Sequence, residues 1–291
     1  MRLRGGLGNQ LFQYWAGRVV AAEAHGDLHL DVTETTLTHD RIGLTALALE
    51  GHSLCSWRPT GGRSPAFDLE WLRLRETWST RFGRTTLGTL SEILDYRAGN
   101  DPRNETLDGF FTSFKIPNAA REHGLSLAMK PRRPTSWFHA MSKCAARDQP
   151  LMVHVRRGDY SANPFWGLLD EPYYRNALQS LGYLNDQPVW VFSDDPQAAM
   201  NLMEGLVAQR DLRVILPPEG VPAAESLLLM ALGSGLVTAN STMSWWAGQV
   251  SGARVTVPVP FHPAMRADQD LTTPEALFSR PNWLPIASAW T

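Results

Sequence analysis

The 291-residue chain has little cysteine, little net charge and no long apolar run, and each absence excludes a class of protein. Cys55 and Cys144 lie far apart and form no CxxC pair, which argues against a disulfide scaffold or a cysteine zinc site. The 27 basic and 29 acidic residues give a net charge of −2, which supplies no field for gripping nucleic acid or an anionic membrane. No stretch approaches the roughly 18 to 20 apolar residues that span a bilayer, and Met1–Arg4 leads into glycines rather than a signal peptide. We therefore expect a soluble cytoplasmic protein without nucleic-acid partners or a transmembrane segment.

What is present is enough apolar material for a buried core, at 43% hydrophobic and 19% charged residues. Near the start, apolar residues at 11, 12, 15, 16, 19 and 20 predict a helix over 11–22 with one buried face, and alternation predicts a strand over 28–32. The second half alternates more regularly. Strands are predicted at 151–155, 189–192, 214–216, 235–239 and 253–259, with helices at 173–181, 196–206, 223–232 and 241–250. This alternation with short connections predicts an α/β fold with a mainly parallel sheet, Rossmann-like in the second half.

The length suggests two domains of ordinary size. A strand at 107–113 closes the first half, and helical stretches with a basic proline segment fill 117–150. We place the boundary near residue 148, giving an N-terminal domain 1–148 and a C-terminal domain 149–291. The organisation of 60–105, which is rich in Arg, Gly and Thr, is not legible from the sequence.

Two adjacent arginines, Arg156 and Arg157, follow the strand that ends at Val155. A guanidinium stays charged at any relevant pH and offers a planar fork that matches phosphate oxygens. Ligands of open α/β sheets bind beyond the carboxyl ends of the strands, where this pair stands. The pair therefore indicates an anionic ligand, with an ion pair to Asp159 as the structural alternative.

Two further strand ends carry polar residues. Asp194 and Asp195 suit hydrogen bonding to a nucleobase or ribose, although Ser-Asp-Asp-Pro is also a good helix start. After the strand near Ala239, small polar residues open a helix whose free N–H groups and dipole favour phosphate, with simple N-capping as the alternative. These residues are Asn240, Ser241, Thr242 and Ser244.

A glycine-rich turn, Gly5–Gln10, opens the chain, and its candidate ligand-contacting residues are Gly6, Gly8, Asn9 and Gln10. It is not a full dinucleotide fingerprint, since Leu11 stands where the third glycine would fall, and we interpret it as a tight loop allowing close backbone approach. No metal-binding set stands out. Asp268–Asp270 reads as a solvated turn rather than a Mg²⁺ site, and we expect neither metal nor cofactor.

Taken together, the segments GGLGNQLFQY, HVRRGDY, FSDDP and NSTMSWW resemble, in order and spacing, the α-1,2-fucosyltransferases of glycosyltransferase family 11. The resemblance implies a GT-B-type arrangement of two Rossmann-like domains with a cleft between them. GDP-β-L-fucose would bind the C-terminal domain and a galactoside acceptor mainly the N-terminal one. Fucose would pass with inversion to the 2-hydroxyl of the β-galactoside, in glycan biosynthesis. The oligomeric state is left open.

The resemblance also implies residue roles. His154 and either Asp194 or Asp195 would contact guanosine, and Arg156 the β-phosphate. Ser241, Thr242 and Ser244 would contact the diphosphate. Arg156, alone or with Arg157, would replace a metal at the leaving group.

Asp159 is the candidate base on the acceptor hydroxyl, and a role in orienting the arginines is equally open. Related loops place a Glu where this chain has Ala162, Asn163 and Pro164. Two rival functions remain: a non-catalytic nucleotide or carbohydrate binder of the same fold, and a fucosyltransferase of other linkage or acceptor.

Overall fold

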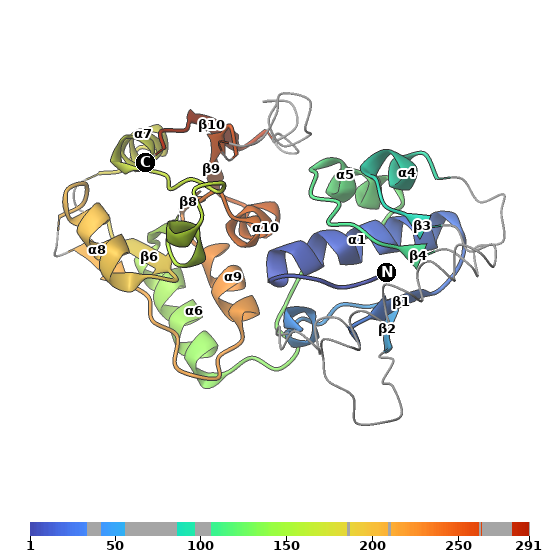
Figure 1. Cartoon of the computed structure of the whole chain (residues 1–291). Coiled ribbons are helices and arrows are strands. Elements are labelled where there is room, and N and C mark those ends of the chain that lie inside the picture. Colours follow the sequence, from blue (N-terminus) through green and yellow to red (C-terminus); the bar gives the residue numbers. More distant parts are fainter. Residues whose placement is uncertain are drawn as a thin grey trace, which may run out of the picture. The chain divides into compact units, whose positions relative to one another are not determined.

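The computed structural model describes residues 1–33, 42–55, 86–96, 106–184, 187–208, 211–261, 263 and 281–290. Contacts divide the chain into two compact units, Met1–Leu127 and Ala128–Thr291 (Figure 1). This division falls earlier than residue 148 because helix α6 (Ser136–Asp148) packs on helix α9 (Ala223–Met230). Thr135, the N-cap of α6, donates its amide (2.8 Å) and its hydroxyl (2.5 Å) to the buried Glu225 of α9. These bonds make α6 part of the C-terminal unit.

The N-terminal unit contains two short parallel strand pairs joined by the first residues of the chain. Strand β1 (Leu28–Asp31) pairs with β2 (His52–Cys55), and β3 (Thr86–Leu87) pairs with β4 (Thr106–Leu107). The amide of Arg2 donates to Leu107 O (3.0 Å), and that of Leu3 donates to Asp31 O (2.9 Å). The strand expected over 107–113 is therefore confined to Thr106–Leu107, and Phe111 beyond it has a positive φ of 50°.

Helix α1 (Leu7–Glu23) is the longest element of this unit, and it begins earlier than the expected residue 11 because Gly6 is its N-cap. The helix contacts the short helices η1 (Gly43–Ala46), α4 (Leu90–Leu94) and α5 (Lys115–Glu122). Its buried apolar residues include Leu11, Phe12, Trp15, Ala16, Val19 and Val20, which are the residues that the sequence assigned to the buried face.

The C-terminal unit is built on a six-stranded parallel sheet in the order β7-β6-β5-β8-β9-β10. The strands are Leu151–Val155 (β5), Val189–Ser193 (β6), Leu212–Val214 (β7), Gly235–Val237 (β8), Arg254–Val259 (β9) and Trp283–Ala287 (β10). The expected strand at 214–216 is found two residues earlier, and β10 is an additional strand. The chain order reverses between β5 and β8, and doubly wound sheets bind their ligands at such a switch point.

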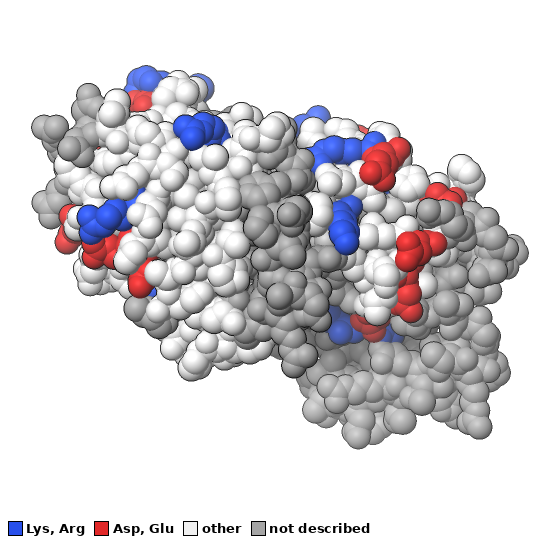
Figure 2. Space-filling view, turned by 90° about the horizontal axis from the view of Figure 1, so that it is seen from above, with Lys and Arg blue, Asp and Glu red and all other residues white. Residues whose placement is uncertain are grey.

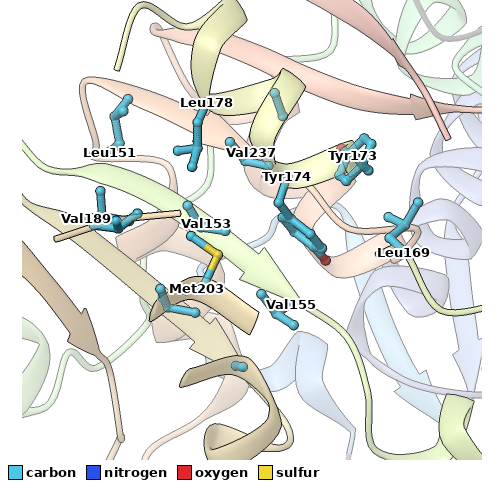
Figure 3. Close-up of a cluster of buried hydrophobic side chains, with 14 of the residues drawn as sticks. Leu151, Val153, Val155, Leu169, Tyr173, Tyr174, Leu178, Val189, Met203 and Val237 are labelled. Carbon is cyan, nitrogen blue, oxygen red and sulfur yellow. The ribbon is translucent and has the colours of Figure 1, made fainter. Parts of the chain in front are cut away.

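Helices cover both faces of this sheet. Successive side chains of a strand point to opposite faces, and Val153 and Val155 of β5 point into a core with helices α7 (Glu171–Ser180) and α8 (Pro196–Glu204). Figure 3 shows this cluster, which includes Tyr173, Tyr174, Leu178, Val189, Met203 and Val237.

The opposite face is covered by α6 and by α10 (Thr242–Val250), with α9 packed on both. On this face, Cζ of Arg213 in β7 lies 5.3 Å from the Trp190 ring centroid. Nη2 of the same arginine lies 3.8 Å from Sδ of Met141 in α6. Gly248 of α10 lies against Val255. The strand register places Val255 in the same cross-strand row as Trp190, so the two side chains lie on the same face of the sheet. With both faces covered, the carboxyl edge is where the sheet can meet a ligand.

The surface carries charge of both signs. On the face in Figure 2, basic and acidic residues are scattered among uncharged ones, and neither sign gathers into a large patch over the described residues. Within the described ranges, no helix has the length and apolar character needed to cross a membrane.

Candidate functional site

The polar loops that follow β5, β6 and β8 meet at the carboxyl edge of the C-terminal sheet. The register pairs Val155 with Ser193 across β5 and β6, and Val153 with Val237 across β5 and β8. The residues directly after these strand ends are therefore neighbours around the switch point. This arrangement brings Arg156, Asp194 and the 238–244 segment to one edge, as the sequence predicts.

Arg156 is the cation at the centre of this edge. Its Nη2 donates to Asp159 Oδ1 at 2.6 Å, and its Nη1 lies 3.0 Å from Asp194 Oδ2. Its Nε is buried and has no hydrogen-bond partner among the described residues. The Asp159 side chain is 65% exposed, so its ion pair with Arg156 contributes little and is easily exchanged. An arriving phosphate oxygen can replace Asp159 at Nη2 while Asp194 keeps hold of Nη1.

Arg157 is directed elsewhere. Its Nη2 donates to the carbonyl of Leu169 at 2.8 Å, whereas its backbone amide donates to Asp194 Oδ1 at 2.9 Å. Of the two arginines, only Arg156 presents its guanidinium to the carboxylates of the edge. Arg157 contributes its backbone to the loop, and its side chain is bound to a main-chain oxygen.

The two aspartates after β6 have different surroundings. The carboxylate of Asp194 forms an ion pair with Arg156 and accepts a hydrogen bond from the Arg157 amide. Gly158 packs so closely against it that an added Cβ would lie 2.3 Å from Asp194 Oδ2. Asp195 instead caps helix α8, since its Oδ1 accepts from the amide of Ala198 at 3.0 Å. The structure thus gives Asp195 the capping role that the sequence left open, and it makes Asp194 the residue that holds the arginine loop.

His154 is buried on β5, with 5% of its surface exposed. Burial lowers its pKa to about 4, and the neighbouring charge of Arg156 acts in the same direction. The imidazole is therefore neutral near pH 7, and its Nδ1 has no hydrogen-bond partner within the described part of the chain. A neutral ring with an unpaired nitrogen beside Arg156 is suited to hydrogen bonding with a nucleobase.

Helix α10 begins directly after the loop of β8. Ser241 is its N-cap residue and makes no side-chain capping bond, and Thr242 is the first helical residue. The hydroxyl of Ser244 is buried and bonded to Ala239 N (3.2 Å) and Ser241 O (3.2 Å), so it braces the turn. The first N–H groups of any helix lack intrahelical acceptors, and with the helix dipole they form a site for phosphate.

Asn240 links the loops that follow β5 and β8. Its buried side-chain amide donates to the main-chain carbonyls of Trp166 (2.9 Å) and Gly167 (3.3 Å). The main-chain carbonyl of Asn240 accepts a hydrogen bond from the Tyr160 hydroxyl at 3.1 Å. Asn240 therefore fixes the shape of the β5 loop, residues 156–170. The sequence prediction named neither Tyr160 nor Trp166 as a site residue, although the aromatic residues in the segment that follows the arginine pair were the available signal.

The glycine-rich turn lies in the N-terminal unit, where it starts helix α1. Gly5 has a φ of +66°, a conformation that favours glycine, and Gly6 is an N-cap without a side chain. The buried Gln10 donates to Gly5 O (2.8 Å) and accepts from Leu44 N (3.4 Å), so its side chain holds the turn. Gly8 is buried and Asn9 half-buried in the first helical turn. Backbone N–H groups of this turn are what the loop can offer a ligand.

Among the described residues, no three His, Cys, Asp or Glu side chains form a group that could hold a metal ion. Asp268–Asp270 lies outside the described residues, and of 60–105 the structure describes only 86–96.

No family model matches the chain. Over 102 residues it is 36% identical to the O-antigen biosynthesis glycosyltransferase WbnK of Escherichia coli, a match that spans 32% of each protein. Over 265 residues it is 25% identical to an alpha-1,2-colitosyltransferase of Escherichia coli, which covers 84% of both chains.

Two solved structures share the fold of the chain. E. coli ADP-heptose LPS heptosyltransferase II has a TM-score of 0.51 at 9% identity, covering 98% of this chain and 88% of that one. A glycosyltransferase of family 9 from Veillonella parvula has a TM-score of 0.50 at 12% identity, covering 98% and 84%. The chain is thus similar in sequence to bacterial glycosyltransferases, and its mixed α/β fold with parallel sheets resembles that of GT-B-like glycosyltransferases.

Proposed function

We propose that the chain is an inverting, metal-independent α-1,2-fucosyltransferase that moves L-fucose from GDP-β-L-fucose to the 2-hydroxyl of a β-galactoside. The observation that carries the proposal is Arg156, held by Asp194 at the switch point of a doubly wound sheet and linked through Tyr160 to the loop that starts α10. The relatives support glycosyl transfer, and one of them is a 1,2-transferase by its name. The sequence motifs support fucose and GDP as the donor groups.

In the proposed complex, the β-phosphate of the donor displaces the exposed carboxylate of Asp159 from Arg156 Nη2. The first N–H groups of α10, with Ser241 and Thr242, take the remaining phosphate oxygens. The neutral His154 faces the guanine. Because the Arg157 guanidinium is bound to Leu169 O, Arg156 is the one arginine of the pair that meets the phosphate charge in this complex.

The reaction breaks the bond between C1 of fucose and the β-phosphate oxygen while the acceptor 2-hydroxyl oxygen bonds to C1 from the opposite side. Negative charge grows on the departing GDP, and Arg156 and the start of α10 stabilise it where it develops. The hydroxyl proton passes to Asp159, whose carboxylate is released from Arg156 when the phosphate binds.

A second donor deserves a parallel test because the relative matched over 84% of the chain is a colitosyltransferase. Colitose is L-fucose without its 3-hydroxyl, so the same phosphate site serves both donors. GDP-fucose and GDP-colitose assayed side by side distinguish the two, since a site that hydrogen-bonds the 3-hydroxyl discriminates strongly against a sugar that lacks it.

The test of the proposed function is release of GDP from GDP-fucose in the presence of lactose, with the linkage of the product determined by NMR. We expect Arg156→Ala to lower kcat by roughly 10² to 10³-fold, the range seen when one charge-stabilising donor is removed. Arg175→Ala is the matched control, because Arg175 lies on α7 in the same unit and its guanidinium forms an ion pair with Glu171 on the exposed surface of that helix. Near-normal turnover of Arg156→Ala refutes the mechanism, and GDP binding without sugar transfer indicates a non-catalytic binder.

A further inference from the structure

An aromatic cluster extends outward from Arg156 along the β5 loop. The guanidinium carbon of Arg156 lies 5.2 Å from the Tyr160 ring centroid, and the Tyr160 ring stacks on Trp166 at 5.5 Å with an interplanar angle of 16°. Phe165 meets Trp166 edge to face at 4.9 Å. The outer two rings are solvent-accessible, with Phe165 52% and Trp166 36% exposed. Large exposed aromatic surface beside a ligand-binding edge is typical of a recognition site.

The loop that carries these rings is held in place from several directions. Asn240 binds the carbonyls of Trp166 and Gly167, and the Asn163 side chain accepts from the Phe165 amide at 3.1 Å. Gly167 has a φ of +65° and packs against Trp290, since a Cβ there would lie 2.9 Å from that ring. The rings are therefore positioned before a ligand arrives, which reduces the ordering cost of binding.

The position of each ring relative to the phosphate site decides which sugar it meets. The fucosyl group is joined directly to the β-phosphate on Arg156, so it occupies the space next to the guanidinium and Tyr160. Trp166 lies on the far side of Tyr160 from Arg156 along this row of rings, its ring centroid 5.5 Å from that of Tyr160. The sugar beyond the fucosyl group is the acceptor.

A β-galactoside also has the chemistry for such a surface. Its 4-hydroxyl is axial, so the C–H groups of C3, C4 and C5 form one continuous apolar face that stacks on a flat ring. We propose that Trp166, flanked by Phe165, is a stacking platform for the acceptor galactoside, so that the C-terminal unit supplies part of the acceptor site. This inference rests on the proposed function. The resemblance places the acceptor mainly on the N-terminal domain, and the platform would be a further acceptor contact, supplied by the C-terminal unit.

The test compares Trp166→Ala and Trp166→Phe with a matched control, Leu184→Ala. Leu184 is 66% exposed in the same unit and precedes β6, at the opposite end of the strands from the site. For each variant we would measure the KM for lactose at saturating GDP-fucose, the KM for GDP-fucose, the Kd of GDP by calorimetry and the melting temperature.

We expect Trp166→Ala to raise the lactose KM about tenfold, the effect of losing one aromatic contact, while the GDP Kd and the donor KM stay unchanged. Trp166→Phe should recover most of the loss, and Leu184→Ala should match the wild type. An unchanged lactose KM in a folded Trp166→Ala protein overturns the platform. A change in donor KM or GDP Kd instead overturns its assignment to the acceptor.

Saturation-transfer NMR with lactose separates this inference from the proposed reaction. If the wild type transfers no fucose, the reaction fails, yet lactose signals that are strong with the wild type and absent with Trp166→Ala still support the platform. Equal lactose signals from the two proteins refute it.

Discussion

Gly158→Ala gives the sharpest test of how the site holds its arginine. An added Cβ would lie 2.3 Å from Oδ2 and 2.8 Å from Cγ of Asp194, both shorter than any real Cβ contact. Since ordinary contacts begin at 3.4 Å, the carboxylate or the loop must move by about 1 Å. The same carboxylate binds Nη1 of Arg156 and the amide of Arg157, so both interactions weaken together.

The expected magnitude follows from these contacts. A hydrogen bond to a charged group contributes about 1.5 to 3 kcal/mol, and a side chain that can partly readjust keeps some of it, so we expect about 1 to 2 kcal/mol of lost stability. Catalysis should suffer more, because a displacement of about 1 Å in a charge-stabilising group can cost roughly 10²-fold in rate. The GDP-fucose kcat/KM should therefore fall about 100-fold while the protein remains folded.

The assay pairs steady-state kinetics with urea unfolding, and Gly205→Ala is the matched control. Gly205 also lies in the C-terminal unit, its φ is −78°, and an added Cβ meets nothing within 4 Å. We expect the control to retain wild-type activity. If Gly158→Ala also retains it, Asp194 does not position Arg156, and the account of the site is wrong.

Three further predictions concern the same edge of the sheet. If Arg156 replaces a metal, activity should persist in EDTA, and loss that Mg²⁺ or Mn²⁺ restores would contradict this. If Asp159 is the base, Asp159→Asn should lower kcat by roughly 10² to 10⁴-fold with little change in the GDP Kd; retained turnover leaves Asp159 only an orienting role. His154 has a pKa of about 4 when folded against 6.5 for an ordinary histidine, so the unfolded chain binds more protons between these values. Stability should therefore fall by about 3 kcal/mol as the pH drops from about 6.5 through 4, and urea unfolding of His154→Gln should show a shallower decline.

The sequence by itself determined the local pattern of the second half. Strands buried on both faces read as short apolar runs, and helix starts such as Asp195–Pro196 are set by neighbours within one turn. These signals depend on adjacent residues only, so β5, β6, β8 and β9 and helices α7 to α10 were predictable within a few residues. Strand β10 was not among the predicted strands, and its place at the edge of the sheet explains why Pro285 is tolerated there.

Only the tertiary structure decided which polar residues act together. Asp194 reaches Arg156 from another strand, Asn240 reaches Trp166 across 74 positions of sequence, and Glu225 draws helix α6 into the C-terminal unit across 90. The sequence left open whether Arg157 joins Arg156 at the leaving group, whereas in the fold the Arg156 guanidinium pairs with the carboxylates and the Arg157 guanidinium binds a main-chain carbonyl. Such choices depend on which strands lie side by side, and strand order is set by long-range packing that no local pattern records.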